Sequence, residues 1–212
     1  MRNVACQDAR LDFGVDRRRA GILLHPTSLP GGVNGSTGLA GQNNGDFGSD
    51  AFRFIDFLAA CGMSVWQMLP LGPTHSDDSP YQCLSVHAGN PRLISLDMPV
   101  QCGWLPADHP AEQSADTSSY RCACLKQAYQ GFVQHASAED HAALKAFSVQ
   151  QRWLQDFALY GALRQEHAGR SWLDWPPSLR DREPHALEEA RQRLADAMAQ
   201  ICFEQFIFFR QW

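Results

Sequence analysis

The sequence predicts an α/β fold in which a strand, a helix and a second strand are followed by a mostly helical region. Two short apolar runs, at 21–25 and 64–70, have strand character, and a proline closes each of them. The run between them, at 49–62, has apolar residues at helical spacing. Because two strands joined by a helical crossover lie parallel, we expect one right-handed βαβ unit.

The first strand leads into a Gly- and Asn-rich loop at 26–50, and a loop of this length inside a domain is usually functional or mobile. Ser49 or Asp50 can cap the helix that follows, and Gly62 is typical of a helix end. The buried face of this helix is expected to consist of Ala51, Phe54, Phe57 and Leu58. On the second strand, Trp66 and Gln67 are interpreted as core residues.

The stretch DDSPYQCLSVHAGNP, at 77–91, follows the second strand. Proline and glycine interrupt it too often for a helix, and it is too polar for a core strand, so we expect a loop. Residues 90–100 are expected to be extended. Such loops at strand ends are frequent sites of ligand binding.

Helical patterns dominate from about Ala111 to the end of the chain. We expect a helix at 148–164, a tryptophan-bearing connector at 169–184 and one long amphipathic helix at 185–212. Apolar residues recur every seven positions along this last helix, at Leu187, Leu194, Ile201 and Phe208.

The composition is that of a globular protein, since the 212 residues are 44% hydrophobic and 19% charged. A net charge of -5 leaves no basic stripe to pair with phosphates, which argues against a nucleic-acid partner. The apolar run at 51–71 is broken by Arg53, Asp56 and Gln67, and is too polar to span a membrane. No apolar run of signal-peptide length stands at the N-terminus, so we expect a cytoplasmic protein with no membrane partner.

Seven cysteines occur, and none belongs to a Cys-x-x-Cys pair. Cys122 and Cys124 lie closest in sequence, but the usual spacing of paired zinc ligands is missing. We therefore expect no metal site and interpret the cysteines as reduced thiols.

Two features predict that the sequence is part of a longer protein. Two parallel strands do not make a sheet with both faces covered, and the chain ends at FFRQW inside an apolar helix. Six blocks follow one another along the chain: RRRAGILLHPTSLPGG, AFRFIDFLAACGMSVWQMLPLGPT, SPYQCLSVHAGNPRLISL, WLQDFALYGALR, WLDWPPSLR and FEQFIFFRQW.

Together these blocks resemble the N-terminal part of the 4-α-glucanotransferases of the amylomaltase type, glycoside hydrolase family 77. The resemblance runs from about residue 19 to residue 212 and is weakest at 101–145. It implies a (β/α)8 TIM barrel, of which this chain would hold the first two βα units and a mostly helical insertion. The implied divisions are a polar lead-in at 1–19, the first part of the catalytic barrel at 20–100, and a helical insertion subdomain, truncated at its end, at 101–212.

The resemblance also implies an activity: a segment of an α-1,4-glucan is transferred to the 4-hydroxyl of glucose or of another glucan. The reaction is a retaining double displacement that uses no metal or organic cofactor. In this family the catalytic carboxylates follow later barrel strands, so we expect them beyond Trp212. Two alternatives stay open: a non-catalytic piece that binds glucan weakly, and an α-glucan hydrolase of the same clan.

The candidate substrate contacts lie in and after the SPYQ motif. Tyr81 can stack on a glucose ring, and the matching tyrosine of the family lines the subsite next to the scissile bond. The alternative is a tyrosine that anchors the loop. Ser79 and Gln82 are suited to bind sugar hydroxyls or to shape the turn around Pro80. Asn90 is a further candidate, although its amide is more typical of a turn.

Other polar residues receive a structural interpretation. Asp77 and Asp78 are read as solvated loop acids and not as a catalytic pair. His25 lies near Thr27 and Ser28, but no G-x-S-x-G elbow supports a Ser–His nucleophile.

Two further features are the tryptophans of the helical region and an apparent insertion in the first long loop. Trp153, Trp172 and Trp175 are interpreted as core residues of the helical region, with stacking on a glucan as the alternative. Residues 33–43 look like an insertion into a turn that is short in relatives, which would alter acceptor contacts at the first barrel loop.

Overall fold

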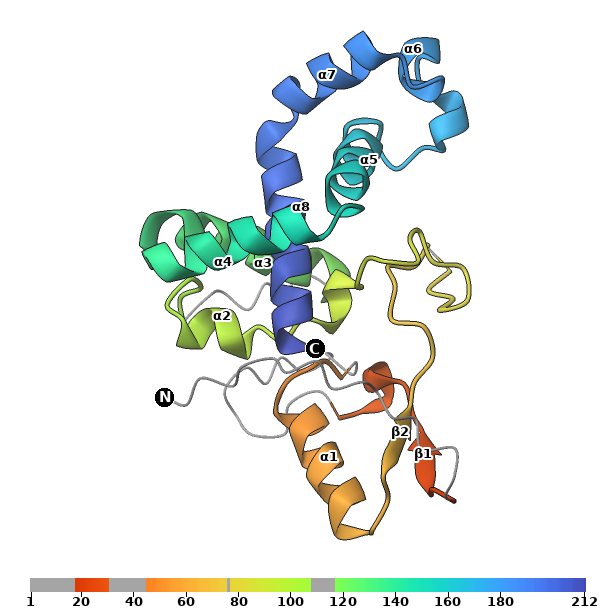
Figure 1. The fold of residues 1–212 in the computed structure, drawn as a ribbon, viewed down its shortest axis with the longest axis vertical. Coiled ribbons are helices and arrows are strands. Elements are labelled where there is room, and N and C mark those ends of the chain that lie inside the picture. Colours follow the sequence, from red (N-terminus) through yellow and green to blue (C-terminus); the bar gives the residue numbers. More distant parts are fainter. Residues whose placement is uncertain (1–17, 31–44, 76, 108–116) are drawn as a thin grey trace.

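The computed structural model describes residues 18–30, 45–75, 77–107 and 117–212. Most of the expected lead-in at 1–19, and all of the expected insertion at 33–43, lie outside these residues. The described chain has a small α/β unit at one end and a larger helical region at the other (Figure 1).

The α/β unit is the predicted strand–helix–strand unit. The strands β1 (Gly21–Leu23) and β2 (Val65–Gln67) pair in parallel, with α1 (Ser49–Ala60) between them in sequence. Both strands are shorter than expected, because the chain turns at Pro26 into a single 3-10 turn, η1 (Pro26–Ser28). The parallel pairing itself is confirmed.

The helix α1 begins and ends close to the predicted residues. Its N-cap is Gly48 and no side chain caps it, so the expected cap from Ser49 or Asp50 is wrong. Gly62, just past its end, has a φ of 72°, a backbone conformation that glycine adopts without strain. Of the predicted apolar face, Ala51 and Leu58 are buried.

The outer side of the α/β unit is open. Phe57 is 52% exposed, and Gln67, expected in the core, is also exposed. Trp66 is half-buried, and its Nε1 donates to the Leu24 carbonyl at 2.7 Å. These side chains stay open because, among the described residues, only two strands form the sheet and α1 covers only part of it.

The rest of the described chain is helical. Its elements are η2 (Pro91–Leu93), α2 (Asp97–Gln101), α3 (Thr117–His135), α4 (Ala138–Gln150), α5 (Leu154–Glu166), η3 (Trp172–Asp174), α6 (Pro177–Arg180), α7 (Pro184–Arg193) and α8 (Ala195–Gln211). Among them, no helix is both long and apolar enough to cross a membrane.

Three sequence expectations for this region are wrong. Residues 90–100 are not extended but form η2 and α2, because Asn90 caps a turn that begins at Pro91. The helix expected at 148–164 is broken between α4 and α5, and the helix expected at 185–212 bends at Leu194. At the first break the chain changes direction so that α4 and α5 can both pack against α8.

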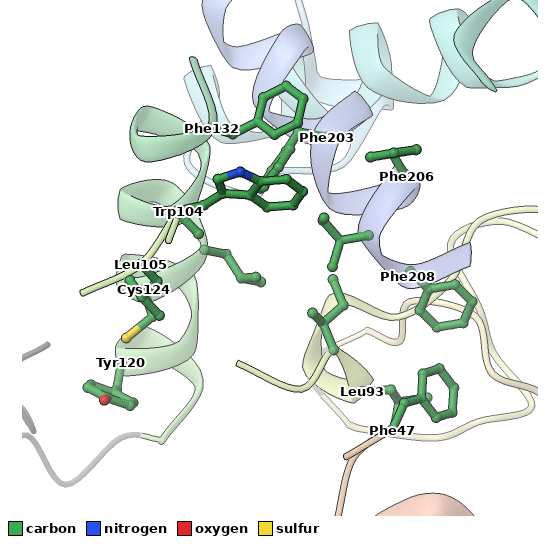
Figure 2. Packing of buried hydrophobic residues seen from close by; sticks show 14 residues of the cluster. Phe47, Leu93, Trp104, Leu105, Tyr120, Cys124, Phe132, Phe203, Phe206 and Phe208 are labelled. Atoms are coloured by element: carbon green, nitrogen blue, oxygen red, sulfur yellow. The ribbon is translucent and has the colours of Figure 1, made fainter. Parts of the chain in front are cut away.

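The central element is α8, which runs through the helical region and ends next to the α/β unit (Figure 1). Its C-terminal half enters a cluster of buried rings, in which Trp104 meets Phe132 edge to face at 4.9 Å (Figure 2). Its N-terminal half enters a second cluster together with α5 and α7. Of the residues repeating every seven positions, Leu194 is half-buried, and the others are buried.

Candidate functional site

A cavity of about 390 Å³ opens at the carboxyl ends of β1 and β2. Its lining comes from the segments that follow the two strands and from α3: His25, Thr27, Ser28, Leu69, Pro70, Gly72, Thr74, Asp78, Pro80, Asn90, Arg92 and Arg121. Ligand sites of parallel α/β proteins lie at this edge of the sheet. The cavity is therefore the candidate functional site.

His25 stands just past the end of β1 and contributes an imidazole to the cavity. Its Nδ1 lies 2.8 Å from the Thr27 hydroxyl and accepts from the Thr27 amide at 3.4 Å. Burial lowers the pKa of His25, and the Pro70 carbonyl partly opposes this shift. The ring is therefore neutral at pH 7, and we assign its proton to Nε2 because Nδ1 accepts.

The other ring nitrogen of His25, Nε2, is the one left to face the Pro70 carbonyl or a ligand. Nε2 is buried and makes no hydrogen bond of normal geometry to a described residue. The hydroxyl beside the ring belongs to Thr27 and lies in a local turn. This contact occupies Nδ1, so no serine–histidine pair is formed through that nitrogen.

The SPYQ loop is shaped by short-range hydrogen bonds. The Ser79 amide donates to the Asp77 carboxylate at 3.2 Å, and the Gln82 amide donates to the Ser79 carbonyl at 3.3 Å. The Cys83 thiol donates to the Pro80 carbonyl at 3.0 Å. The backbone of Ser79 thus forms part of the turn, as its turn-forming interpretation predicts.

Tyr81 lies at the tip of this loop with 74% of its surface exposed. A ring so exposed does not anchor the loop by burial, and its face is open to a ligand. Neither Tyr81 nor Ser79 nor Gln82 lines the cavity, whereas Asn90 does. The sequence candidates therefore divide between the cavity wall and the loop tip beside it.

Asn90 has two structural contacts in the wall of the cavity. Its Oδ1 accepts from the Arg92 amide at 3.0 Å and so caps η2, and its own amide donates to the Leu71 carbonyl at 2.8 Å. The turn role expected from the sequence is present. The Asn90 side-chain Nδ2 is not needed for that turn and is available to an acceptor.

Asp77 and Asp78 are exposed, as predicted, but they are more than solvated acids. The Arg92 guanidinium forms an ion pair with Asp78, and the Thr74 hydroxyl lies 3.3 Å from the same carboxylate. Asp78 has a φ of 54°, a left-handed conformation that aspartate tolerates better than most residues. The two acids have different partners and do not act as a pair.

Two glutamines of α8 that sequence reasoning missed support the site, one buried and one half-buried. Gln205 is fully buried, accepts from the Gly89 amide at 2.8 Å and donates to the Gly89 carbonyl at 2.9 Å. Gln211 makes the same pair of bonds to Ser95, both at 2.8 Å. The available signal was a glutamine on the apolar face of a helix, six positions before a second glutamine.

A partly buried ion pair supports the site from α3. Arg121 is 7% exposed, lies 3.1 Å from Asp46 and also donates to the Ile94 carbonyl. Burial raises the pKa of Asp46, and the Arg121 guanidinium opposes that shift. Asp46 also accepts from the Gly48 amide at 2.8 Å, so the pair joins the start of α1 to the helical region.

The tryptophans of the helical region have different environments. Trp175 is buried, as predicted, and packs on Tyr160 with ring centroids 5.7 Å apart. Trp153 is half-buried and stacks on His87 at 6.0 Å. Trp172 is 48% exposed, so its interpretation as a core residue is wrong.

The sequence predicted no metal site and reduced cysteines. No group of three or more potential ligand side chains gathers within the part of the chain that the structure describes. No disulfide joins the described cysteines, of which Cys124 and Cys202 are buried as small apolar side chains.

The fold and the cavity define an α/β protein with a candidate ligand site at the carboxyl ends of its parallel strands. The family model for the 4-alpha-glucanotransferases, glycoside hydrolase family 77, matches residues 24–212. The chain therefore belongs to this family, and the resemblance seen in the sequence is confirmed.

Relatives and a solved structure agree with this assignment. A 4-alpha-glucanotransferase of Thermus thermophilus is 41% identical over 203 residues, covering 92% of this chain and 38% of the relative. One from Synechocystis is 40% identical over 208 residues, covering 93% of this chain and 39% of the relative. The structure of amylomaltase from Streptococcus agalactiae in complex with acarbose matches with a TM-score of 0.81 at 30% identity, over 92% of this chain and 40% of that chain. The chain thus spans about two fifths of the length of these relatives.

Proposed function

We propose that this chain is the N-terminal part of a cytoplasmic 4-α-glucanotransferase. The complete protein would transfer a segment of an α-1,4-glucan to the 4-hydroxyl of glucose or of another α-1,4-glucan, with no cofactor. One observation carries this proposal: the chain belongs to the family, and its cavity lies at the carboxyl ends of two parallel strands.

The chemistry would be a retaining double displacement. A carboxylate attacks the anomeric carbon while a carboxylic acid protonates the leaving sugar, and a sugar hydroxyl then displaces the carboxylate. The two carboxyl groups must stand about 5–5.5 Å apart, and we assign them to chain beyond Trp212. No acid of the present cavity takes either role, because Asp78 is engaged by Arg92.

The present chain would contribute one wall of the site. We assign the exposed ring of Tyr81 to stacking on a glucose unit, with Ser79 and Gln82 as hydroxyl partners beside it. Asn90 would bind sugar hydroxyls from inside the cavity, and Nε2 of His25 would do so in exchange for its interaction with the Pro70 carbonyl. All of these are neutral groups, which suits an uncharged substrate.

We further propose that β1, α1 and β2 are the first units of a (β/α)8 barrel, at 20–100, and that 101–212 forms a helical insertion. An apolar cavity of about 470 Å³ between α1, β2 and the end of α8 supports this. Exposed Phe52, Ile55 and Trp212 lie along it, and Leu23 is exposed on β1. Exposed strand edges and apolar faces of this size suit packing against further strands and helices.

Maltotriose disproportionation tests the proposal on the complete protein. Two maltotriose molecules should give glucose and maltopentaose, followed by longer maltodextrins. A hydrolase of the same clan would instead release glucose and maltose without longer products. The proposal is wrong if the complete protein forms no oligosaccharide longer than maltotriose.

A non-catalytic piece is the second candidate for the isolated chain, and the coverage of about two fifths of its relatives favours it. The purified 212-residue chain should show no turnover of maltotriose and at most weak binding. Tyr81→Ala should weaken that binding without changing thermal stability, because the ring is exposed. Turnover by the purified chain would exclude this candidate.

A further inference from the structure

A second cavity, of about 300 Å³, lies in the helical region between α5, η3, α6 and the start of α7. This part of the molecule is at the opposite end from β1 and β2 (Figure 1). We propose that this cavity is a glucan-binding site separate from the one at the strand ends. Its volume is at the lower end of the range for small-ligand pockets, about 300–1,000 Å³.

Three aromatic side chains line this cavity: Tyr160, Trp172 and Trp175. Tyr160 and Trp175 pack at a tilt of 35°, whereas Trp172 stands on η3 with about half of its surface open. An open indole face next to a cavity is the usual platform for the C–H face of a sugar ring, because both surfaces are apolar and flat. Trp172 is therefore the expected stacking residue.

The cavity also has an unsatisfied polar group in its wall. Trp175 is 6% exposed, and its Nε1 has no hydrogen-bond partner among the described residues. His167 stacks on the same indole with ring centroids 5.4 Å apart. Its Nε2 is also buried and has no hydrogen-bond partner among the described residues. Buried donors are almost always paired, and each exception calls for a bound partner such as water or a ligand. A sugar hydroxyl can serve as that partner.

The charged groups at the cavity indicate a neutral, polyhydroxylated ligand. Asp156, Arg180 and Arg182 belong to its lining, so both signs of charge are present. An anion would meet Asp156 and a cation would meet the two guanidinium groups. Vicinal hydroxyls of a sugar can accept from arginine and donate to aspartate at the same time.

Of these charged side chains, Asp156 is free to rearrange around such a ligand, whereas the Arg180 guanidinium is held by Asp181 at 2.8 and 2.9 Å. Asp156 is 64% exposed, and its contacts to Arg182 and Arg191 are long, at 3.6 and 3.9 Å. Exposed pairs of this kind contribute little to stability, so exchanging them for sugar contacts costs little. The choice of an α-1,4-glucan among sugars rests on the proposed function; the choice of a sugar rests on the cavity.

Such a site would hold a long glucan at a second point. A second contact on one chain raises the effective concentration at the first, and can strengthen overall binding by about 10²–10⁴-fold without a new contact at the first site. The complete protein should then prefer long glucans to maltotriose. Trp172→Ala should reduce that preference and leave the reaction of maltotriose unchanged.

Fluorine NMR of the 212-residue chain labelled with 5-fluorotryptophan tests the site directly. Each of the six tryptophans gives one resonance, assigned by single Trp→Phe variants. On titration with maltoheptaose, the Trp172 resonance should shift and saturate. Tyr81→Ala should leave this shift intact, and cellohexaose, a β-linked glucan, should produce a weaker one.

Variants of the cavity give the matched comparison. Trp172→Ala should weaken maltoheptaose binding at this site about tenfold, followed through the Trp175 resonance. Leu173→Ala, at an exposed neighbour that does not line the cavity, should leave the affinity unchanged. Asp156→Asn, which keeps the side-chain shape, should weaken binding without lowering the melting temperature, and it stands in if Trp172→Ala does not fold.

The outcomes separate this inference from the proposed function. An unshifted Trp172 resonance at saturating maltoheptaose would overturn the site, and so would equal affinities of the Trp172→Ala and Leu173→Ala chains. A saturable Trp172 shift supports it even if the complete protein proves to have no transferase activity. Conversely, transferase activity with an unshifted Trp172 would remove the second site alone.

Discussion

Gln205 joins α8 to the loop that follows β2, and its replacement by leucine measures how much this connection contributes to the free energy of unfolding. The side chain is fully buried and bonds both the amide and the carbonyl of Gly89, at 2.8 and 2.9 Å. Gln205→Leu would leave two buried backbone groups unpaired, at about 1–3 kcal/mol each. The added apolar surface offsets about 1 kcal/mol. We therefore expect the free energy of unfolding to fall by about 3 kcal/mol, within a range of about 1–5.

Urea denaturation of the 212-residue chain, followed by circular dichroism, measures this change. The matched control is Gln192→Leu on α7, where the glutamine is exposed and bonds only Glu188, at 3.3 Å. That substitution should change stability by no more than about 0.5 kcal/mol. Hydrogen exchange at the Gly89 amide should also accelerate in Gln205→Leu. If the two leucine variants are equally stable, the reasoning about the buried bonds is wrong.

Three further predictions concern groups around the same site. Gly89→Ala should destabilise the chain by about 1–3 kcal/mol in thermal unfolding, because a Cβ there would lie 2.1 Å from the Phe208 ring; a wild-type melting temperature would contradict this. His25 has a lowered pKa in the folded chain, so the unfolded chain takes up a proton at a higher pH than the folded chain does. The free energy of unfolding should therefore fall as the pH drops below 6.5, and His25→Asn should remove this pH-dependent loss. Arg121→Leu should cost about 3 kcal/mol at pH 7, since it leaves the half-buried Asp46 carboxylate and the Ile94 carbonyl without their donor. This loss should shrink at acid pH as the Asp46 carboxyl is protonated, and urea titrations at two pH values decide it.

Local sequence signals predicted the α/β unit because its elements follow directly from short-range preferences. The apolar runs at 21–25 and 64–70 contain the two strands, and the helical spacing of apolar residues at 49–62 predicted α1. Parallel pairing followed from the crossover between them. The loop at 77–91 was predicted from its prolines and glycines, which act on the backbone of their immediate neighbours.

Signals of the same kind failed where packing against α8 sets the conformation. Both breaks occur within continuous helical patterns. The break between α4 and α5 lets each of them pack against α8, and the break at Leu194 separates α8 from α7, which also packs on α5. At the site, the sequence indicated Tyr81 and Asn90 from loop position and family motif. It did not indicate Gln205 or Arg121, whose partners lie 116 and 75 residues away.

Composition and motifs alone were enough to determine the family, the parallel βαβ unit and the loop that carries the candidate contacts, since these depend on residue type and local spacing. Tertiary structure decided which side chains line the candidate site and what supports them. Burial of Gln205 and Arg121 turns two polar residues into structural connections, because an unpaired polar group in the interior is costly whereas the same group in water is not. Exposure of Trp172 and Tyr81 leaves two aromatic rings open to a ligand, because only the folded chain decides which apolar faces remain uncovered.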